Sequence, residues 1–343
     1  MDYQFVELLQ IALGNRKSLP RIPSDKEWIG LLCEAQRQAV VGVLTDGLEK
    51  LPQEQRPRPE IILQWLGLAQ ITEDTYTLHV ERAKELTNRF AERGLKTCVL
   101  KGIGTAQYYP NPARRQCGDI DLWADGGEKE VLAWLRSQCK VGKLSWLHAD
   151  AEFFEDVQVE VHFHSSWLYA PVCNKRLQRW FERNKGSQMV VNRDLGIACP
   201  TARFNAIYSL VHALHHLMEE GVGMRHVVDY YYILKALPIS HHDEVMRVLN
   251  YIGLGKFAAA MMWVLAEVCG MERNHLFCEP NEIEGRFLLD EIKAGGNFGQ
   301  SRQDSKQRNT FARWCMMVRH YSSEALWMIP WKVWHRGWMR AHN

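Results

Sequence analysis

The sequence VLKGIGTAQYYPNPARRQCGDIDLWAD, from Val99 to Asp125, decides how the rest of the chain can fold. An apolar run ends in this stretch, a glycine turn follows, and prolines break the short helix after the turn. The pattern therefore predicts a strand, a turn, a short helix, a loop and a second strand. Side chains alternate between the two faces of a strand. Asp119 and Asp121 are therefore expected on one face, while Ile120 points into the core.

The two aspartates predict a metal site. Neighbouring carboxylates repel each other, and a divalent cation bound through oxygen ligands removes that conflict, a role that suits Mg²⁺ best. The turn just upstream, at Gly102 and Gly104, offers backbone N–H groups at a helix start, where anions bind. A cation site beside an anion cradle indicates phosphoryl-transfer chemistry.

A third acidic residue lies in a later stretch with the periodicity of a strand. In DVQVEVHFH, residues 156–164, apolar side chains alternate with polar ones. Glu160 falls in the middle of the polar face and is able to lie beside the strand of Asp119 and Asp121. His162 shares that face, and we expect it either to hydrogen-bond a carboxylate or to be a satisfied histidine of the sheet.

The segments LKG, YYP, GDIDLW and VEVHFHSSW, with an arginine at position 115, resemble the bacterial uncharacterised nucleotidyltransferase family. That family falls within the nucleotidyltransferase superfold of polymerase β type. The superfold usually has Gly-Gly or Gly-Ser at its turn, whereas this chain has Lys101-Gly102 with Gly104 nearby, which fits the narrower family. The motifs cover the middle third of the chain, and the helical flanks fit in a general way.

The resemblance predicts an α+β fold, in which a polymerase β-like core has a mixed sheet of about five strands. We expect an N-terminal helical region over residues 1–95, a catalytic core over 96–198 and a C-terminal helical region with a Trp-rich basic tail over 199–343. Helical periodicity predicts helices over residues 2–14, 25–43, 60–93, 128–139, 201–218, 224–237, 242–250 and 255–269. Alternation predicts strands over residues 96–101, 119–123, 143–148, 152–163 and 187–191, and residues 295–308 have the composition of a polar loop.

The resemblance also implies a metal-dependent enzyme, which moves a nucleoside monophosphate from an NTP to a hydroxyl group and releases pyrophosphate. Asp119, Asp121 and Glu160 would hold two Mg²⁺ ions, with Mn²⁺ as a substitute. Glu160 would complete the site of the ion that activates the attacking hydroxyl and would help to take its proton. A non-catalytic nucleotide-binding regulatory module on the same fold is the second hypothesis.

Four residues are candidates for binding the nucleotide phosphates, and each also has a structural interpretation. Gly102 and Gly104 either let the backbone approach phosphate or form an ordinary strand-to-helix turn. Lys101 either neutralises the triphosphate and the leaving pyrophosphate or lies at the surface at a strand end. Arg115 either clamps a phosphate bidentately or buttresses the two aspartates.

The resemblance further implies that a pair of later helices lines the nucleotide or acceptor cleft with His212, Arg225 and Asp229. Arg225 and Asp229 are four residues apart, so the alternative is that they pair with each other on one helix. His212 and His216 are one helical turn apart, a spacing that can bind zinc. Ala213 stands where the zinc-protease motif has glutamate, which argues against that class of enzyme.

The composition is that of a folded protein with no strong nucleic-acid signal, since the formal net charge is only +2. Nine cysteines without a C-x-x-C pair argue against a zinc ribbon or a disulfide framework and for a reducing compartment. No basic and apolar leader follows Met1, and no run of about 18 apolar residues is present. We therefore expect a cytoplasmic protein.

The sequence from Thr310 onward carries tryptophans at helical spacing, with Lys332, Arg336 and Arg340 on a second stripe. This pattern is typical of a last helix packed on a domain, and also of an interfacial membrane helix, while Pro330 is expected to interrupt it. A peripheral membrane protein acting through this tail is the third hypothesis. The expected partners are an NTP, a hydroxyl-bearing acceptor (a small molecule, a glycan or lipid intermediate, a protein or an RNA end) and a weak membrane-surface contact.

Overall fold

The computed structural model describes residues 3–297 and 310–342, and a five-stranded sheet forms its centre. The strand order is β1-β2-β5-β4-β3. Strands β2 and β5 run parallel, and the other neighbouring pairs run antiparallel. The strands are β1 (Lys96–Val99), β2 (Ile120–Asp125), β3 (Lys140–Leu144), β4 (His148–Glu152) and β5 (Val159–His162). The predicted α+β class with a mixed sheet is confirmed.

The register between β2 and β5 decides which side chains share a face. Asp121 lies opposite Glu160, and Leu122 lies opposite Val161. Because side chains alternate along a strand, the two acids lie on one face and the two apolar residues on the other. The apolar face packs on the helix α4 (Pro59–Glu92) in a buried core. The sheet thus presents its acids on the side away from α4.

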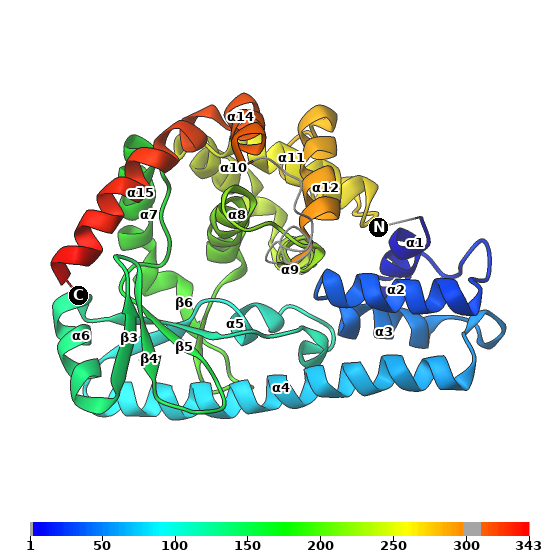
Figure 1. Ribbon diagram of the computed structural model, residues 1–343, viewed down its shortest axis with the longest axis horizontal. Helices are drawn as coiled ribbons and strands as arrows, with labels where there is room; N and C mark the ends of the chain where they lie inside the picture. The colour runs from blue at the N-terminus through cyan, green and yellow to red at the C-terminus, as the bar shows by residue number, and fades with distance from the viewer. Residues whose placement is uncertain (1–2, 298–309, 343) are drawn as a thin grey trace.

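Helix α4 runs beneath the sheet and continues to the N-terminal helices (Figure 1). Trp65, Ala83 and Phe90 are among the residues that it buries. Pro59 occupies its first turn, where the missing N–H of proline is tolerated. Gly94 follows its end with a φ of 82°, a left-handed value that favours glycine. The helix predicted over 60–93 and closed by Gly94 is confirmed.

Three shorter helices precede α4, and their bounds are α1 (Tyr3–Ala12), α2 (Asp25–Arg37) and α3 (Val41–Lys50). Ser24 and Glu27 form the capping box that the sequence predicts at the start of α2. The prediction of a single helix over 25–43 is wrong, because the chain leaves the helix after Arg37 and Ala39 has a φ of 55°. The physical reason lies in contacts with a distant part of the chain.

Those contacts are made by Gln38, which caps the start of helix α9 (Met224–Ala236). The side-chain oxygen of Gln38 accepts a hydrogen bond from the N–H of Met224 at 2.8 Å, and its backbone oxygen accepts one from Arg225 at 3.2 Å. Backbone N–H groups at a helix start have no partner within the helix, so these two bonds satisfy them. The chain therefore leaves α2 where Gln38 satisfies the backbone N–H groups of α9. Local apolar periodicity contains no signal of this tertiary contact.

The helices α8 (Ala202–Met218) and α9 lie above the sheet, on the opposite side from α4 (Figure 1). Thr201 caps α8, since its side chain accepts a hydrogen bond from the N–H of Phe204. The remaining helices are α5 (Ile103–Ala106), α6 (Gly127–Gln138), α7 (Pro171–Gln188), α10 (His242–Tyr251), α11 (Gly255–Glu267), α12 (Glu282–Gly295), α14 (Thr310–His320) and α15 (Ser322–His342). Short 3₁₀ turns are η1 (Gln53–Gln55), η2 (Pro112–Arg114), η3 (Ile239–His241) and η4 (Arg273–His275).

The helices predicted over 201–218, 224–237, 242–250 and 255–269 are therefore confirmed. Sequence analysis missed α7 and α12. Helix α7 buries only Leu177, Trp180, Phe181 and Gln188 of its 18 residues, so its apolar periodicity is weak. Of the predicted polar loop over 295–308, Gly295 belongs to α12, and residues 298–308 lie outside the described part of the chain.

One of the strand predictions is wrong, and another is confirmed as a strand that pairs outside the main sheet. Residues 143–148 comprise the end of β3, a turn over 145–147 and the start of β4, and the backbone N–H of Ser145 donates to the backbone oxygen of His148 across the turn. The strand predicted over 187–191 forms no edge of the main sheet. It is β6 (Met189–Val191), which pairs with β7 (Ala198–Pro200) in a separate two-stranded sheet. The alternating stretch 156–164 is a strand only over β5.

The C-terminal helix α15 runs through Pro330, so the prediction that this proline interrupts it is wrong. Pro330 lies on the exposed side of the helix, as does Leu326, the residue whose backbone carbonyl loses its N–H partner. Trp331 stacks on Trp167 at 5.2 Å between ring centroids. Trp327 and Trp334 are 46% and 50% exposed. Part of the tail therefore packs on the domain, and part of it faces outward.

The larger of two buried cores joins the two ends of the chain, from Phe5 to Ala325. The smaller core lies between α4, α6 and the apolar face of the sheet. The division into residues 1–95, 96–198 and 199–343 stays a prediction from sequence. Within the described residues, no helix is long and apolar enough to cross a membrane.

Candidate functional site

A cavity of about 270 Å³ lies between the acidic face of the sheet and the helices α8 and α9. Asp119, Asp121 and Glu160 all line it, and one carboxylate oxygen from each lies within 4.8 Å of the others. Asp119 directly precedes β2, Asp121 is in β2 and Glu160 is in β5. The structure thus brings together the three acids that the sequence singles out.

The three carboxylates differ in how their charges are compensated. The neighbouring Asp121 carboxylate, together with burial, raises the pKa of Asp119. Burial alone would raise the pKa of Asp121, but the positive charges of Lys101 and His162 outweigh it and hold that pKa below its usual range. Burial likewise opposes ionisation of Glu160, whose pKa is lowered by hydrogen bonding to His162. Asp119 therefore keeps the least compensated charge of the three.

A divalent cation with oxygen ligands fits this arrangement. Three carboxylates converge from two strands, and Oδ2 of Asp121 is buried with no hydrogen-bond partner among the described residues. An unsatisfied buried carboxylate oxygen is energetically costly, and a cation coordinated there removes that penalty. Hard oxygen ligands of this kind are the ones that Mg²⁺ and Mn²⁺ prefer.

Lys101 lies inside the cavity, so its interpretation as a surface lysine at a strand end is wrong. Its Nζ lies 2.6 Å from Oδ1 of Asp121. Burial opposes its charge, but the nearby Asp121 outweighs burial and raises the pKa of Lys101. The ammonium of Lys101 therefore stays positive. It occupies a position beside Asp121 to which a metal cation would also be attracted.

The two glycines of the turn have different surroundings. Gly102 lines the cavity at the start of α5, with a φ of 60° that side chains rarely adopt. Gly104 is buried and is not part of the cavity wall. A Cβ at Gly104 would collide with the backbone carbonyl of Val99, so close packing of α5 on β1 explains this glycine.

Arg115 pairs with Asp229 across 114 positions of sequence. Its Nε and Nη2 donate to the two carboxylate oxygens at 3.0 and 2.8 Å, and both residues are buried. The hydroxyl of Tyr109 donates to the same carboxylate at 2.6 Å. This bidentate pair ties the loop before β2 to α9. Neither interpretation drawn from the sequence, a phosphate clamp or a buttress of the aspartates, includes this partner.

Arg225 is the other buried arginine of the cavity wall. Burial, followed by the charge of Arg115, lowers its pKa. Its Nη1 donates to the backbone oxygen of Gln116 at 3.3 Å. The carboxylate of Asp229, expected on the basis of spacing to pair with Arg225, binds Arg115 through both oxygens.

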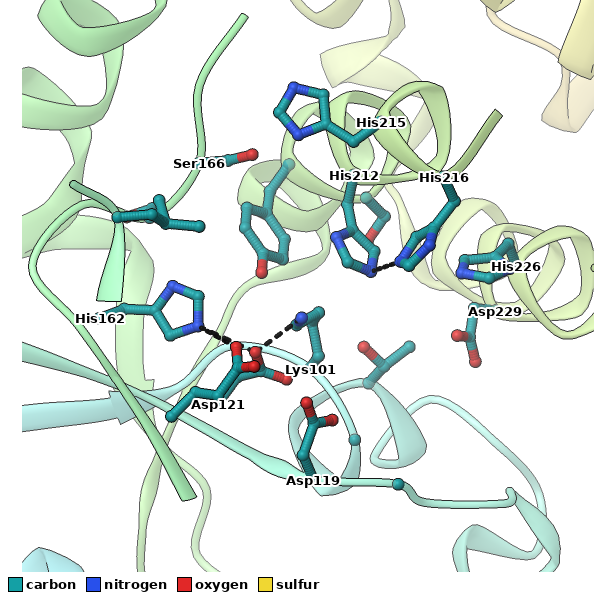
Figure 2. A pocket seen from close by; sticks show the side chains of 18 of the residues that line it. Lys101, Asp119, Asp121, His162, Ser166, His212, His215, His216, His226 and Asp229 are labelled. Atoms are coloured by element: carbon teal, nitrogen blue, oxygen red, sulfur yellow. Dashed lines mark hydrogen bonds and ion pairs between the residues drawn. The ribbon is translucent and has the colours of Figure 1, made fainter. Parts of the chain in front are cut away.

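His162 holds the aspartate of β2 from the neighbouring strand. Its Nε2–H donates to Oδ1 of Asp121 at 2.9 Å (Figure 2), and only 2% of the residue is exposed. Burial would lower the pKa of His162, but the hydrogen bonds to Asp121 and Glu160 raise it to about 9. The sequence left two interpretations of His162 open, and the structure confirms the hydrogen bond to a carboxylate.

Sequence analysis missed two histidines of this cavity. His148 lies opposite His162 in the β4–β5 register, with Nδ1 3.4 Å from Oε2 of Glu160. Burial, followed by the charge of His162, lowers its pKa to about 4. His226 of α9 joins His212 and His216 of α8 in the opposite wall. Strand β4 has little apolar alternation, and His226 comes from a second helix, so no local spacing indicates either residue.

Comparison with known families adds an independent finding. A sequence model described as "Uncharacterised nucleotidyltransferase" matches residues 24–270, which is more than half of the chain. The chain belongs to this nucleotidyltransferase family. The match begins at the cap of α2 and ends just after α11, so it includes the whole sheet and both helices above the cavity.

Among solved structures, the chain is similar to an antigenic nucleotidyltransferase-like protein from Paracoccidioides brasiliensis. The TM-score is 0.32 at 11% sequence identity, over 50% of this chain and 85% of the other. No curated protein matches the chain.

Proposed function

We propose that this protein transfers a nucleoside monophosphate from an NTP to a hydroxyl group of an acceptor and releases pyrophosphate. Asp119, Asp121 and Glu160 would hold two Mg²⁺ ions, with Mn²⁺ as a substitute. The observation that carries the proposal is the convergence of these carboxylates in one cavity, with Oδ2 of Asp121 buried and unpartnered among the described residues. Membership of the nucleotidyltransferase family supports the same class of reaction.

The reaction needs charge compensation at the phosphates. When bound, the metal ions neutralise phosphate charge and lower the pKa of the attacking hydroxyl. The hydroxyl oxygen bonds to the α-phosphorus, the bond from that phosphorus to the bridging oxygen breaks, and pyrophosphate leaves with the electron pair. Glu160 is the more accessible carboxylate of the β2–β5 pair, which supports its proposed role of taking the hydroxyl proton.

The positive side chains of the cavity would bind the phosphates. Lys101 lies beside the acids. If a cation replaced it at Asp121, the ammonium of Lys101 would be available to bind a phosphate oxygen. Gly102, at the start of the four-residue helix α5, would offer backbone N–H groups to a phosphate. Arg225 faces the cavity from α9, while Arg115 is engaged with Asp229, so Arg225 is the better candidate for a phosphate contact.

The acceptor is a hydroxyl-bearing small molecule, a glycan or lipid intermediate, a protein or an RNA end. A net charge of +2 gives no support to a long nucleic acid. We also propose a weak contact of α15 with a membrane surface, which would suit a lipid-linked acceptor. All nine cysteines are free thiols, which supports a reducing, cytoplasmic location.

The first prediction tests the proposed reaction. The protein is incubated with each labelled NTP, Mg²⁺ and fractions of a cell lysate, and pyrophosphate release is measured. We expect release with at least one NTP, and a loss of at least about 100-fold in Asp121→Asn, because a charge aligned with the transition state is removed. Asp125→Asn changes an exposed acid at the end of the same strand and should keep the activity. Equal release by both variants would contradict the proposal.

A nucleotide-binding module without turnover is the second candidate function. The observation that favours it is that Lys101 and His162 already compensate the charge of Asp121. Calorimetric titration with a non-hydrolysable NTP separates the two functions. Binding without pyrophosphate release in any lysate fraction would support the module, and the absence of both would remove both proposals.

A further inference from the structure

The wall of the cavity opposite the acids holds three histidines from two helices. His212 and His216 come from α8, and His226 comes from α9. One ring nitrogen from each lies within 4.8 Å of the others, and Nε2 of His212 lies 3.0 Å from Nε2 of His216. Figure 2 shows the three rings gathered on one side of the cavity, with Lys101 between them and the aspartates.

The spacing of these nitrogens suits a tetrahedral metal ion. Zinc–nitrogen bonds of about 2.0–2.1 Å at tetrahedral angles place two ligand nitrogens about 3.3 Å apart. The His212–His216 pair is already near that separation, and the third ring is adjacent, 4.7 Å from His216 between centroids. All three rings line the cavity wall, and neutral imidazole nitrogen is the ligand form that such an ion binds.

Neighbouring groups hold the rings in place. Oε2 of Glu220 lies 3.6 Å from Nδ1 of His216, and the backbone N–H of Gly223 donates to Nδ1 of His226 at 3.3 Å. The Glu220 carboxylate beside Nδ1 of His216 is the kind of acceptor that orients histidine ligands in metal sites, whereas the Gly223 contact only fixes the position of the His226 ring. Both helices are anchored, α9 by the Arg115–Asp229 pair and by Gln38. The cluster is therefore built on rigid elements rather than on a loop.

We propose that His212, His216 and His226 bind one divalent transition-metal ion of the zinc class, separate from the ions held by the acids. Three nitrogen ligands favour such an ion, whereas carboxylates favour Mg²⁺. Three protein ligands leave a fourth position open, as in catalytic zinc sites. Because the three histidines line the cavity, a water or an oxygen of the acceptor would complete the coordination. The site goes beyond the proposed nucleotidyl transfer and stands whether or not that reaction is found.

The test measures metal binding alone, on full-length protein without a histidine tag and stripped of metal by a chelator. Zn²⁺ is titrated by competition with a chromophoric chelator, in excess Mg²⁺ to fill the acidic site. We expect one equivalent of bound Zn²⁺. His212→Gln and His226→Gln should each weaken binding by more than about 100-fold, because loss of a ligand exceeds the 10–100-fold effect of its neighbours.

Two variants serve as matched controls. His215→Gln alters a buried histidine of the same helix that packs on Trp167 at 4.0 Å between ring centroids, away from the cluster. Asp119→Asn alters the acidic site. Both should keep one equivalent of Zn²⁺ at wild-type affinity. Zinc lost from Asp119→Asn but kept in His226→Gln would place the ion on the carboxylates and overturn the proposal.

A measurement on the wild type covers the case in which a histidine variant does not fold. Cobalt(II) bound to four ligands, three of them nitrogens, absorbs visible light intensely, whereas six-coordinate cobalt absorbs weakly. We expect the intense spectrum at one equivalent of Co²⁺ in excess Mg²⁺, abolished by one equivalent of Zn²⁺. A weak spectrum, or no saturable binding of Zn²⁺ to the wild type, would overturn the proposal without any variant.

Discussion

At the scale of single residues, Asp121 is the most heavily engaged group of the cavity. It is buried, receives the Nζ of Lys101 and the Nε2–H of His162 on one oxygen, and keeps the other oxygen unpartnered among the described residues. Its charge is held without metal, so the acidic centre can fold before any ion binds. A cation would therefore compete with Lys101 for this carboxylate.

The interaction of His162 with Asp121 predicts a pH-dependent stability. The folded-state pKa of His162 is raised from 6.5 to about 9, so its contribution is fully present below pH 6.5 and is lost as pH rises through 9. The loss should be on the order of 3 kcal/mol. Urea unfolding of the metal-free protein between pH 6 and 10 measures it, and His162→Gln should remove this part of the slope.

His164→Gln is the matched control for that measurement. His164 follows β5 on the same face and stacks on Trp146. Its pKa is lowered by burial rather than raised, so the variant should keep the wild-type loss of stability between pH 6.5 and 9. An unchanged slope in His162→Gln would mean that Asp121 and Glu160 do not stabilise the protonated form of this histidine.

At the scale of elements, the buried pair of Arg115 and Asp229 joins the loop before β2 to α9. Removing one charge leaves the other buried and unpaired, so Asp229→Asn should lower the free energy of unfolding by about 3–5 kcal/mol. In a double-mutant cycle, Arg115→Met combined with Asp229→Leu should lose much less than the sum of Arg115→Met alone and Asp229→Leu alone. Urea unfolding of the four proteins measures the coupling.

Tyr109→Phe is the control for this cycle. It removes one hydrogen bond to the same carboxylate and leaves both charges, so we expect a loss of about 1 kcal/mol. A loss in Asp229→Asn no larger than that of Tyr109→Phe would show that the ion pair does not anchor α9.

These elements also explain which parts of the site could be predicted from sequence. The shared face of Asp119 and Asp121 follows from the two-residue period of a strand, and Glu160 follows from the same period in β5. The partner of Arg115 could not be predicted in this way. Asp229 lies on a helix from a distant region, and no spacing rule relates the loop of Arg115 to that helix.

The same limit applies to the fold. Helices with a regular apolar face, such as α4 and α8, were predicted within a few residues. The end of α2 was not, because the hydrogen bonds of Gln38 to α9 are tertiary. Polar strands such as β3 and β4 gain their burial from neighbours rather than from their own periodicity, so their bounds were misplaced.

At the scale of the whole molecule, the tail helix α15 presents two kinds of surface. Trp331 packs on Trp167 and stacks with His335. Leu326, Trp327, Ile329, Val333 and Trp334 are exposed. Exposed tryptophans near basic side chains are typical of helices that lie in a membrane interface. The packing and membrane interpretations of the tail therefore concern different faces of one helix.

We predict that a fraction of the protein floats with anionic lipid vesicles and that less floats with neutral ones, because Arg336 and Arg340 are exposed on the same helix. The double variant Trp327→Ser with Trp334→Ser should lower the floated fraction several-fold. Leu63→Ser changes an exposed apolar residue of α4 and should leave it unaltered. Equal flotation of all three proteins, or none, would argue against a membrane contact.

The cavity also has a consequence for the growing polypeptide. The strands β2 and β5, which carry the acids, have both been synthesised once β5 has left the ribosome. Arg225 and Asp229 of the opposite wall lie on α9, some 65 positions later. Until then the cluster of carboxylates is open to the surrounding water and to its ions. The complete cavity can therefore form only late in translation, after α9 has been synthesised.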